Sequence, residues 1–172
     1  MNREIIFRGK RCDNGEWVYG NYIYRENEDK TWAENIIISN DFSKTEYKVH
    51  PDTVGQYTGL QDKNGNKIYE GDILRVKEFE NLLTDEFTKD ESRFDLFTLD
   101  EIKGEKRAEY ISPVRWEEGG FVVSTNGDYF DMWLASLFGD MKRSNPVLDF
   151  EVIGNIHDNP ELLKGGNQLN FI

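Results

Sequence analysis

Cysteine, long apolar runs and targeting signals are scarce or missing in this sequence. Among its 172 residues there is 1 cysteine, Cys12, which excludes an internal disulfide and a thiolate metal cluster. No stretch approaches the roughly 20 consecutive apolar residues of a transmembrane helix. Residues 1–10 alternate charged and apolar side chains instead of forming the apolar region of a signal peptide. We therefore expect a soluble protein of a reducing cytoplasm, with no membrane partner.

Positive charge is also in short supply. The chain has 21 Lys and Arg against 33 Asp and Glu, so its net charge is −12 at pH 7. Non-specific electrostatic binding to DNA or to an anionic membrane is disfavoured, because such binding is favoured by net positive charge on the protein. Aromatic residues make up 13% of the chain, too many for a disordered acidic protein. A length of 172 residues suffices for one domain or two small ones.

The motifs of common catalytic and nucleotide-binding sites are missing as well. The chain has no G-x-G-x-x-G, Walker or G-x-S-x-G motif. Its 2 histidines, His50 and His157, stand far apart in the sequence and lack the spacing of metal ligands. No histidine accompanies Cys12 to mark it as a nucleophile. The residues thus predict no catalytic site, no cofactor, no metal and no small-molecule ligand.

The sequence does carry the pattern of a β protein. Asn-Gly pairs occur at residues 14–15, 64–65 and 126–127, each between runs of aromatic and β-branched residues. Asn-Gly suits the positive φ angles of type I′ turns, which makes it the strongest short signal for a hairpin. We therefore predict an all-β fold. The expected strands are residues 4–8, 16–24, 35–39, 53–60, 67–69, 73–76, 108–112, 114–116, 121–124 and 150–156.

Two segments depart from this pattern. Residues 77–107 contain ten acidic and six basic residues without a regular period, which indicates a long charged insertion, such as an irregular hairpin. Residues 131–138, with Phe130 just before them, place aromatic and leucine side chains at three- and four-residue offsets. That spacing predicts one short helix that plugs a barrel or covers a sheet.

The hairpins divide into two groups. Residues 1–66 are expected to form an N-terminal barrel-like unit, and residues 67–163 a second one that includes the insertion and the helix. The second unit is expected to be SH3-like, by analogy, because a short turn feeds the apolar strand after Gly71-Asp72. Residues 164–172 are expected to be a flexible tail.

One region departs from the acidic average. Residues 1–11 hold four basic residues and one acidic residue, a net charge of +3, just before several aromatics. Basic side chains next to stacking aromatics on a small barrel favour binding of single-stranded nucleic acid. The competing interpretation is that these charges pair with the protein's own carboxylates and that the aromatics belong to its core. The candidate residues are Arg3, Arg8, Lys10, Arg11, Trp17, Tyr22 and Tyr24.

Four segments of the chain match the pattern of a known family. The most specific match runs from Thr53 to Gly65 (TVGQYTGLQDKNG) and continues from Ile68 to Ile73 (IYEGDI). With these segments the chain resembles the YopX family of phage and prophage proteins. The resemblance implies an all-β fold of two small barrel-like units, and it implies no enzymatic activity, cofactor or site residue. The remaining matches are residues 3–10 with 17–20, residues 114–121 and residues 153–162, so the likeness spans about residues 1–163.

These observations predict a non-catalytic accessory protein of a phage or prophage, acting in the cytoplasm of a bacterial host cell. We expect it to bind a protein partner or to self-associate through exposed strand edges. The acidic segment 77–107 is the expected place for a basic partner. Two alternatives stay open: a single-stranded nucleic-acid binder that uses the N-terminal strands, and a hydrolase-type enzyme with an unrecognised carboxylate site.

Overall fold

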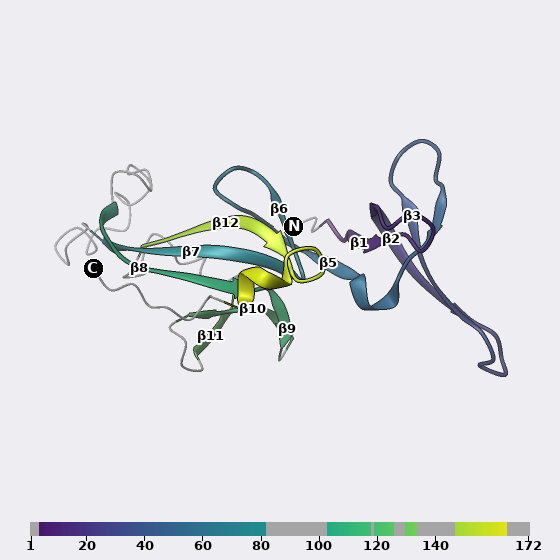
Figure 1. The fold of residues 1–172 in the computed structure, drawn as a ribbon. Coiled ribbons are helices and arrows are strands. Elements are labelled where there is room, and N and C mark those ends of the chain that lie inside the picture. The colour runs from purple at the N-terminus through teal and green to yellow at the C-terminus, as the bar shows by residue number, and fades with distance from the viewer. Residues whose placement is uncertain (1–3, 82–102, 118, 126–129, 134–146, 165–172) are drawn as a thin grey trace. The chain divides into compact units, whose positions relative to one another are not determined.

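The computed structural model describes residues 4–81, 103–117, 119–125, 130–133 and 147–164 (Figure 1). Nearly all regular structure in these residues is β-strand. Their helical segments are short turns of 3-10 helix, η1 (Pro51–Thr53) and η3 (Pro160–Leu163). None of the helical segments described has the length and apolar character needed to cross a membrane. The predicted all-β fold is confirmed.

The chain forms two compact units that exchange a short segment. Unit 1 comprises Met1–Gln61 and Lys67–Gly71, and unit 2 comprises Asp62–Asn66 and Asp72–Ile172. The boundary that the sequence suggested, after residue 66, falls at the end of the Asp62–Asn66 segment, and Lys67–Gly71 still belongs with unit 1. The turn at Asp62–Asn66 belongs with the second unit although both strands that flank it belong with the first.

Unit 1 is built on one six-stranded antiparallel sheet. Its strands follow the order β4-β3-β2-β1-β5-β6. Ile37 is fully buried, as is Ile68, while Tyr57 and Tyr69 pack against each other with ring centroids 5.5 Å apart. The strand bounds are β1 (Phe7–Lys10), β2 (Trp17–Glu26), β3 (Ala33–Ser39), β4 (Glu46–Lys48), β5 (Gly55–Gln61) and β6 (Lys67–Tyr69).

The sheet of unit 1 curls back on itself at the end of β4. An isolated antiparallel bridge pairs Arg11 with Val49. The Cys12 N–H donates to the Lys48 carbonyl at 2.9 Å, and the His50 N–H donates to the Lys10 carbonyl at 2.9 Å. These contacts bring the end of β4 against the end of β1, so the sheet curls in a barrel-like way without a full ladder that would close it.

Unit 2 contains two three-stranded antiparallel sheets in its described residues. The first has the order β12-β7-β8 and the second the order β11-β10-β9. Leu74 and Val76 are buried on one face of β7, whereas Arg75 between them lies partly exposed on the other, as the period of a strand requires. The strand bounds are β7 (Asp72–Asn81), β8 (Lys103–Pro113), β9 (Arg115–Glu117), β10 (Gly120–Thr125), β11 (Phe130–Trp133) and β12 (Val147–Asn155).

The helix expected at residues 131–138 is wrong where the structure describes it. Phe130–Trp133 is strand β11, and its residues pair with β10 from Val122↔Trp133 to Thr125↔Phe130. Short apolar runs suit a helix or a strand equally well, and here the neighbouring strand decides between them. Residues 134–138 lie outside the described residues.

The expected charged insertion begins and ends in regular strands. Residues 77–81 belong to β7 and residues 103–107 to β8, and the two strands pair as far as Asn81↔Lys103. Two register shifts in this ladder, at Glu78/Phe79 and Phe79/Asn81, explain why no period was visible in the sequence. Residues 82–102 lie outside the described residues, as do residues 165–172 of the expected tail.

The Asn-Gly turns differ in type from the prediction. Gly15 and Gly65 have positive φ angles of 73° and 83°, but Asn14 and Asn64 do not, so neither turn is type I′. At the second turn the Gly65 N–H donates to the Asp62 carbonyl at 3.0 Å. This is a type I turn followed by a left-handed glycine, the usual three-residue hairpin connection. The pair at 126–127 lies outside the described residues.

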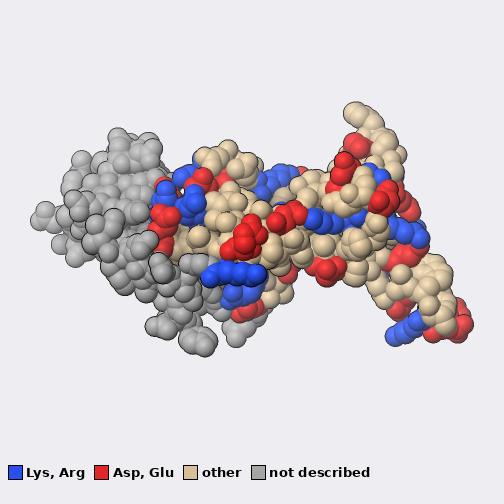
Figure 2. All heavy atoms as spheres, viewed as in Figure 1, with Lys and Arg blue, Asp and Glu red and all other residues tan. Residues whose placement is uncertain are grey.

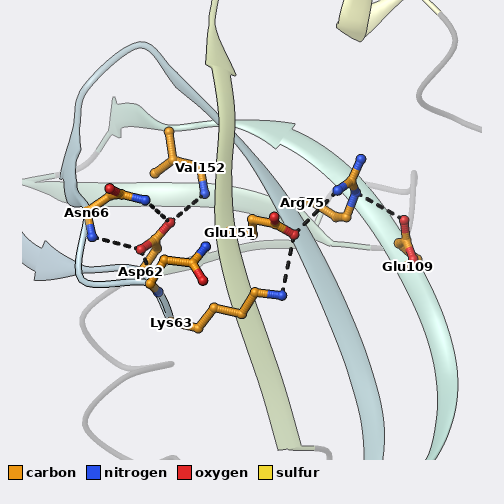
Figure 3. A network of polar contacts seen from close by, with 8 residues as sticks. Asp62, Lys63, Asn66, Arg75, Glu109, Glu151 and Val152 are labelled. Carbon is orange, nitrogen blue, oxygen red and sulfur yellow. Dashed lines mark hydrogen bonds and ion pairs between the residues drawn. The ribbon is translucent and has the colours of Figure 1, made fainter.

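Charged side chains of both signs lie next to one another over the visible face of the described residues (Figure 2). On β7, Arg75 contacts Glu109 of β8 and Glu151 of β12, both at 3.3 Å (Figure 3). Glu151 also lies 3.4 Å from Lys63 in the 62–66 turn. The two basic and two acidic side chains of this group therefore neutralise one another.

Asp62 ties the 62–66 turn to the outer edge of β12. Its nearly buried carboxylate accepts the Val152 N–H at 3.0 Å and the Asn66 N–H at 2.8 Å (Figure 3). The Lys63 N–H donates to the Phe150 carbonyl at 3.1 Å. Burial opposes ionisation of Asp62, but the hydrogen bonds from Asn66, Val152 and Asn64 outweigh it and lower its pKa. The turn thus covers a strand edge that would otherwise be open to pairing with another chain.

Candidate functional site

The residues proposed for nucleic-acid binding lie on two different faces of the unit 1 sheet. Arg8 pairs with Tyr19 and Lys10 with Trp17, and residues directly opposite in a ladder share a face. Tyr22 and Tyr24 occupy the alternate positions of β2 and point to the other face. Arg3 lies outside the described residues.

Contacts within the protein engage the basic members of this set. The nearly buried Arg8 guanidinium lies 4.7 Å from the Trp17 ring and 5.1 Å from the Tyr69 ring, and it donates to the Glu70 carbonyl at 3.1 Å. Lys10 Nζ lies 5.6 Å from the Trp17 ring.

The remaining members of the set also have partners. Arg11 lies 4.5 Å from the Tyr47 ring and binds Asp13 with donor–acceptor distances of 2.9 and 2.5 Å. The Tyr22 hydroxyl donates to Asn35 at 2.6 Å, and the Tyr24 hydroxyl donates to Glu26 at 2.9 Å. No single face of the sheet collects the candidate residues, so single-stranded nucleic-acid binding stays a prediction.

Two adjoining hollows open on unit 1, and both are lined by Cys12 and Lys48. The first hollow, of about 520 Å³, is also lined by Arg11, Asp13, Glu46 and Tyr47, and we call it the Arg11 hollow. The second, of about 510 Å³, adds Trp32, Ala33, Val49 and Pro51 with Glu34 and Asn35, and we call it the Trp32 hollow. Both volumes fall within the range of sites that receive a ligand or a protein side chain.

The Arg11 hollow contains two carboxylates that are already paired. Asp13 binds Arg11, and Glu46 binds Arg25 with distances of 2.8 and 3.0 Å. Hydrogen bonding to these guanidinium groups lowers the pKa of both carboxyls. Carboxylates held ionised in this way are poor proton donors, so this hollow lends no support to a hydrolase with a general acid.

The Trp32 hollow has an exposed indole at its edge. The Trp32 side chain is 51% exposed, and Val49, on the opposite strand segment, is buried. Tyr24 is 53% exposed and pairs in the β2–β3 ladder with Asn35, which also lines the hollow. A mostly apolar hollow with an exposed indole at its edge is a surface suited to another molecule.

Asn27 fixes the turn that positions Trp32. The Trp32 N–H donates to Asn27 Oδ1 at 3.0 Å, and the Asn27 N–H donates to the Trp32 carbonyl at 3.3 Å. Asn27 Nδ2 donates to Thr31 Oγ1 at 2.6 Å. Lys30 completes the turn with a φ of 53°, a conformation that non-glycine residues adopt only where the surroundings impose it. The tryptophan therefore stands on a defined turn and not on a loose loop tip.

The sequence contains little that predicts this site. Trp32 lies in a polar stretch that shows no strand or helix period, and the strand that lines the hollows, β4, is only three residues long. Tyr24 was grouped with basic residues that the structure places elsewhere. The one usable signal was a tryptophan among turn-forming residues, where an aromatic side chain has no core to enter.

Two comparisons relate this chain to known proteins. The model of the YopX protein family matches residues 6–164, nearly the whole chain. The chain belongs to the YopX family. It is also similar to the crystal structure of protein EF1440 from Enterococcus faecalis, with 21% sequence identity over 94% of this chain and 99% of that chain and a TM-score of 0.47. No curated protein matches it.

Residues of the YopX resemblance perform structural tasks in this chain. A Cβ on Gly55 would lie 2.5 Å from the Glu70 carbonyl oxygen, and one on Gly154 would lie 2.6 Å from Asn159 Oδ1. Asp62 covers the edge of β12, as described above. Close packing around the two glycines and hydrogen bonding by Asp62 account for these residues.

Proposed function

We propose that this YopX protein is a non-catalytic module that binds a protein partner through the Trp32 hollow. The observation that carries this proposal is the exposed Trp32 indole, held beside an apolar hollow by a turn with internal hydrogen bonds. From the family we further propose an accessory role for a phage or prophage in the bacterial cytoplasm.

Three features of this surface suit a protein partner. Tryptophan and tyrosine are enriched at protein interfaces and dominate their binding energy. The exposed Trp32 indole stands at the edge of the hollow, where a partner seated there would cover it. Because Asn27 already orders the turn, binding would lose less conformational entropy than binding to a flexible loop.

Site-specific photo-crosslinking in the bacterium that expresses the protein tests this proposal. A benzophenone amino acid replaces Ala33, which lines the hollow, and in a control protein it replaces Phe42. Phe42 is the most exposed large apolar residue of the described chain, and neither hollow includes it. We expect one protein adduct from position 33, lost on Trp32→Ala, and none of that mass from position 42. No adduct from position 33, or the same adducts from both positions, would overturn the proposal.

A further inference from the structure

The turn beside Trp32 carries an excess of acidic side chains. Glu26, Glu28 and Asp29 are exposed there, against one basic residue, Lys30. Neither Glu28 nor Asp29 has an ion pair among the residues that the structure describes. On the other side of the hollow, the exposed Asp52 follows Pro51. Exposed carboxylates without an ion pair among the described residues therefore flank, along the chain, the segments that line the Trp32 hollow.

The nearest basic side chains do not neutralise this excess. Lys48, which lines the hollow, is ion-paired with Glu34, and this pairing raises the pKa of Lys48. Arg25 on β2 is bound by both carboxylate oxygens of Glu46. In Figure 2 the tip of the β2–β3 hairpin shows acidic spheres next to a basic one, within a surface of mostly uncharged residues.

Aromatic rings of this protein already receive guanidinium groups elsewhere in unit 1. Arg8 lies over Trp17 at 4.7 Å and Arg11 lies over Tyr47 at 4.5 Å. In the second case a carboxylate, Asp13, binds the same guanidinium from the side. Trp32 offers an exposed ring with carboxylates nearby but with no guanidinium of its own among the described contacts. The exposed Trp32 ring therefore lacks the guanidinium partner that the Trp17 and Tyr47 rings have among the described residues.

We propose that the Trp32 hollow binds an arginine-bearing basic segment of a partner protein, with a guanidinium stacked on the indole and paired with Glu28 or Asp29. This inference rests on the proposed function and specifies its partner. A net charge of −12 attracts a basic protein from a distance and repels a polyanion. The same net charge disfavours a second copy of this chain as the occupant.

Titration with short peptides, observed by NMR, tests the inference. The probes are capped octapeptides that alternate glycine with arginine, lysine or glutamate, together with oligo-dT, and the signal is the Trp32 indole N–H, assigned by its loss in Trp32→Phe. We expect the arginine peptide to shift this signal, the lysine peptide to bind at least about threefold more weakly, and the glutamate peptide and oligo-dT to have no effect. Equal shifts with the glutamate peptide, or none with the arginine peptide at millimolar concentration, would overturn the inference.

A matched pair of charge variants separates the local carboxylate from net charge. Glu28→Gln removes one exposed carboxylate beside Trp32, and Glu161→Gln removes one exposed carboxylate in unit 2. We expect Glu28→Gln alone to weaken binding of the arginine peptide severalfold. Equal weakening by both variants would show attraction by net charge and would overturn the stacked, paired geometry.

The two proposals fail in different ways. If position 33 gives a protein adduct but the arginine peptide does not shift the Trp32 signal, the proposed interaction module is supported and the proposed basic partner is rejected. If position 33 gives no protein adduct, both proposals are rejected. If oligo-dT shifts the Trp32 indole signal and the arginine peptide does not, the hollow binds nucleic acid and both proposals are rejected.

Discussion

Single residues in this protein are constrained mainly by how closely backbones approach. Gly20 is the clearest case, because a Cβ built there would lie 1.8 Å from the Ile38 carbonyl oxygen. We expect Gly20→Ala to lower the free energy of unfolding by about 3 kcal/mol, since the β2–β3 ladder would have to separate. Urea denaturation measures this loss.

A second glycine provides the control for that prediction. Gly15 has a positive φ, but a Cβ there would meet no atom within 4 Å. Its replacement by alanine should cost only about 1 kcal/mol, through backbone strain alone. Equal losses for the two variants would contradict the steric explanation.

Glu70 should make the protein less stable as pH rises. Burial raises the pKa of its carboxyl above the usual value, against a smaller opposing effect of a backbone hydrogen bond. A group with a raised pKa in the folded state binds its proton more tightly there, so its contribution to stability is lost as pH rises through that pKa. We expect Glu70→Gln to melt at a higher temperature than the parent protein at pH 7 and at nearly the same temperature at pH 3.5. A difference that does not change with pH would contradict this explanation.

Among the elements, the 62–66 turn links regions that are distant in sequence. Asp62 has a lowered pKa, so its contribution is present at neutral pH and is lost as pH falls through that pKa, the opposite sign to Glu70. Asp62→Ala removes four hydrogen bonds to the carboxylate and should cost about 3 kcal/mol at pH 7. It also uncovers the edge of β12, so we expect concentration-dependent association in sedimentation velocity. A stable, monomeric variant would show that the turn does not protect this edge.

The β2–β3 hairpin is the element that carries the proposed interaction surface. Asn27→Ala removes the side-chain hydrogen bonds to Trp32 and Thr31 while leaving the indole in place. We expect the yield of the position-33 adduct to fall severalfold, because the tryptophan would no longer be held ready for binding. Circular dichroism serves as the control, since the rest of the sheet should keep its strand signal. An unchanged adduct yield would show that the turn need not be ordered in advance.

At the level of elements, local pattern identified most strands but not their extent. The runs at residues 16–24, 35–39 and 150–156 correspond to β2, β3 and β12, because alternating aromatic and β-branched residues specify a half-buried strand directly. β4 was missed because three residues are too few to show a pattern, and β11 was mistaken for a helix because its short apolar run fits a helix as well as a strand. The far ends of β7 and β8 were not recognised as strands, because register shifts interrupt the regular pairing there.

At the scale of the whole molecule, the net negative charge disfavours binding of anionic polymers such as nucleic acid. With a net charge of −12 and its N-terminal cations engaged by rings and carboxylates, the protein should not bind a fluorescein-labelled single-stranded oligonucleotide even at low salt. Fluorescence anisotropy measures this. Binding that weakens as salt rises, and that is lost in a Lys10→Gln variant, would revive the nucleic-acid alternative.

Sequence by itself determined the β class of this protein, its acidity, its turns and its place in the YopX family. Each depends on composition or on residues within a few positions of one another. Tertiary structure alone decided which faces the aromatic side chains occupy, that the 62–66 turn covers β12, and that Trp32 stands beside a hollow. These features depend on strand register and on contacts such as Asp62 with Val152, 90 residues apart, which no local pattern encodes.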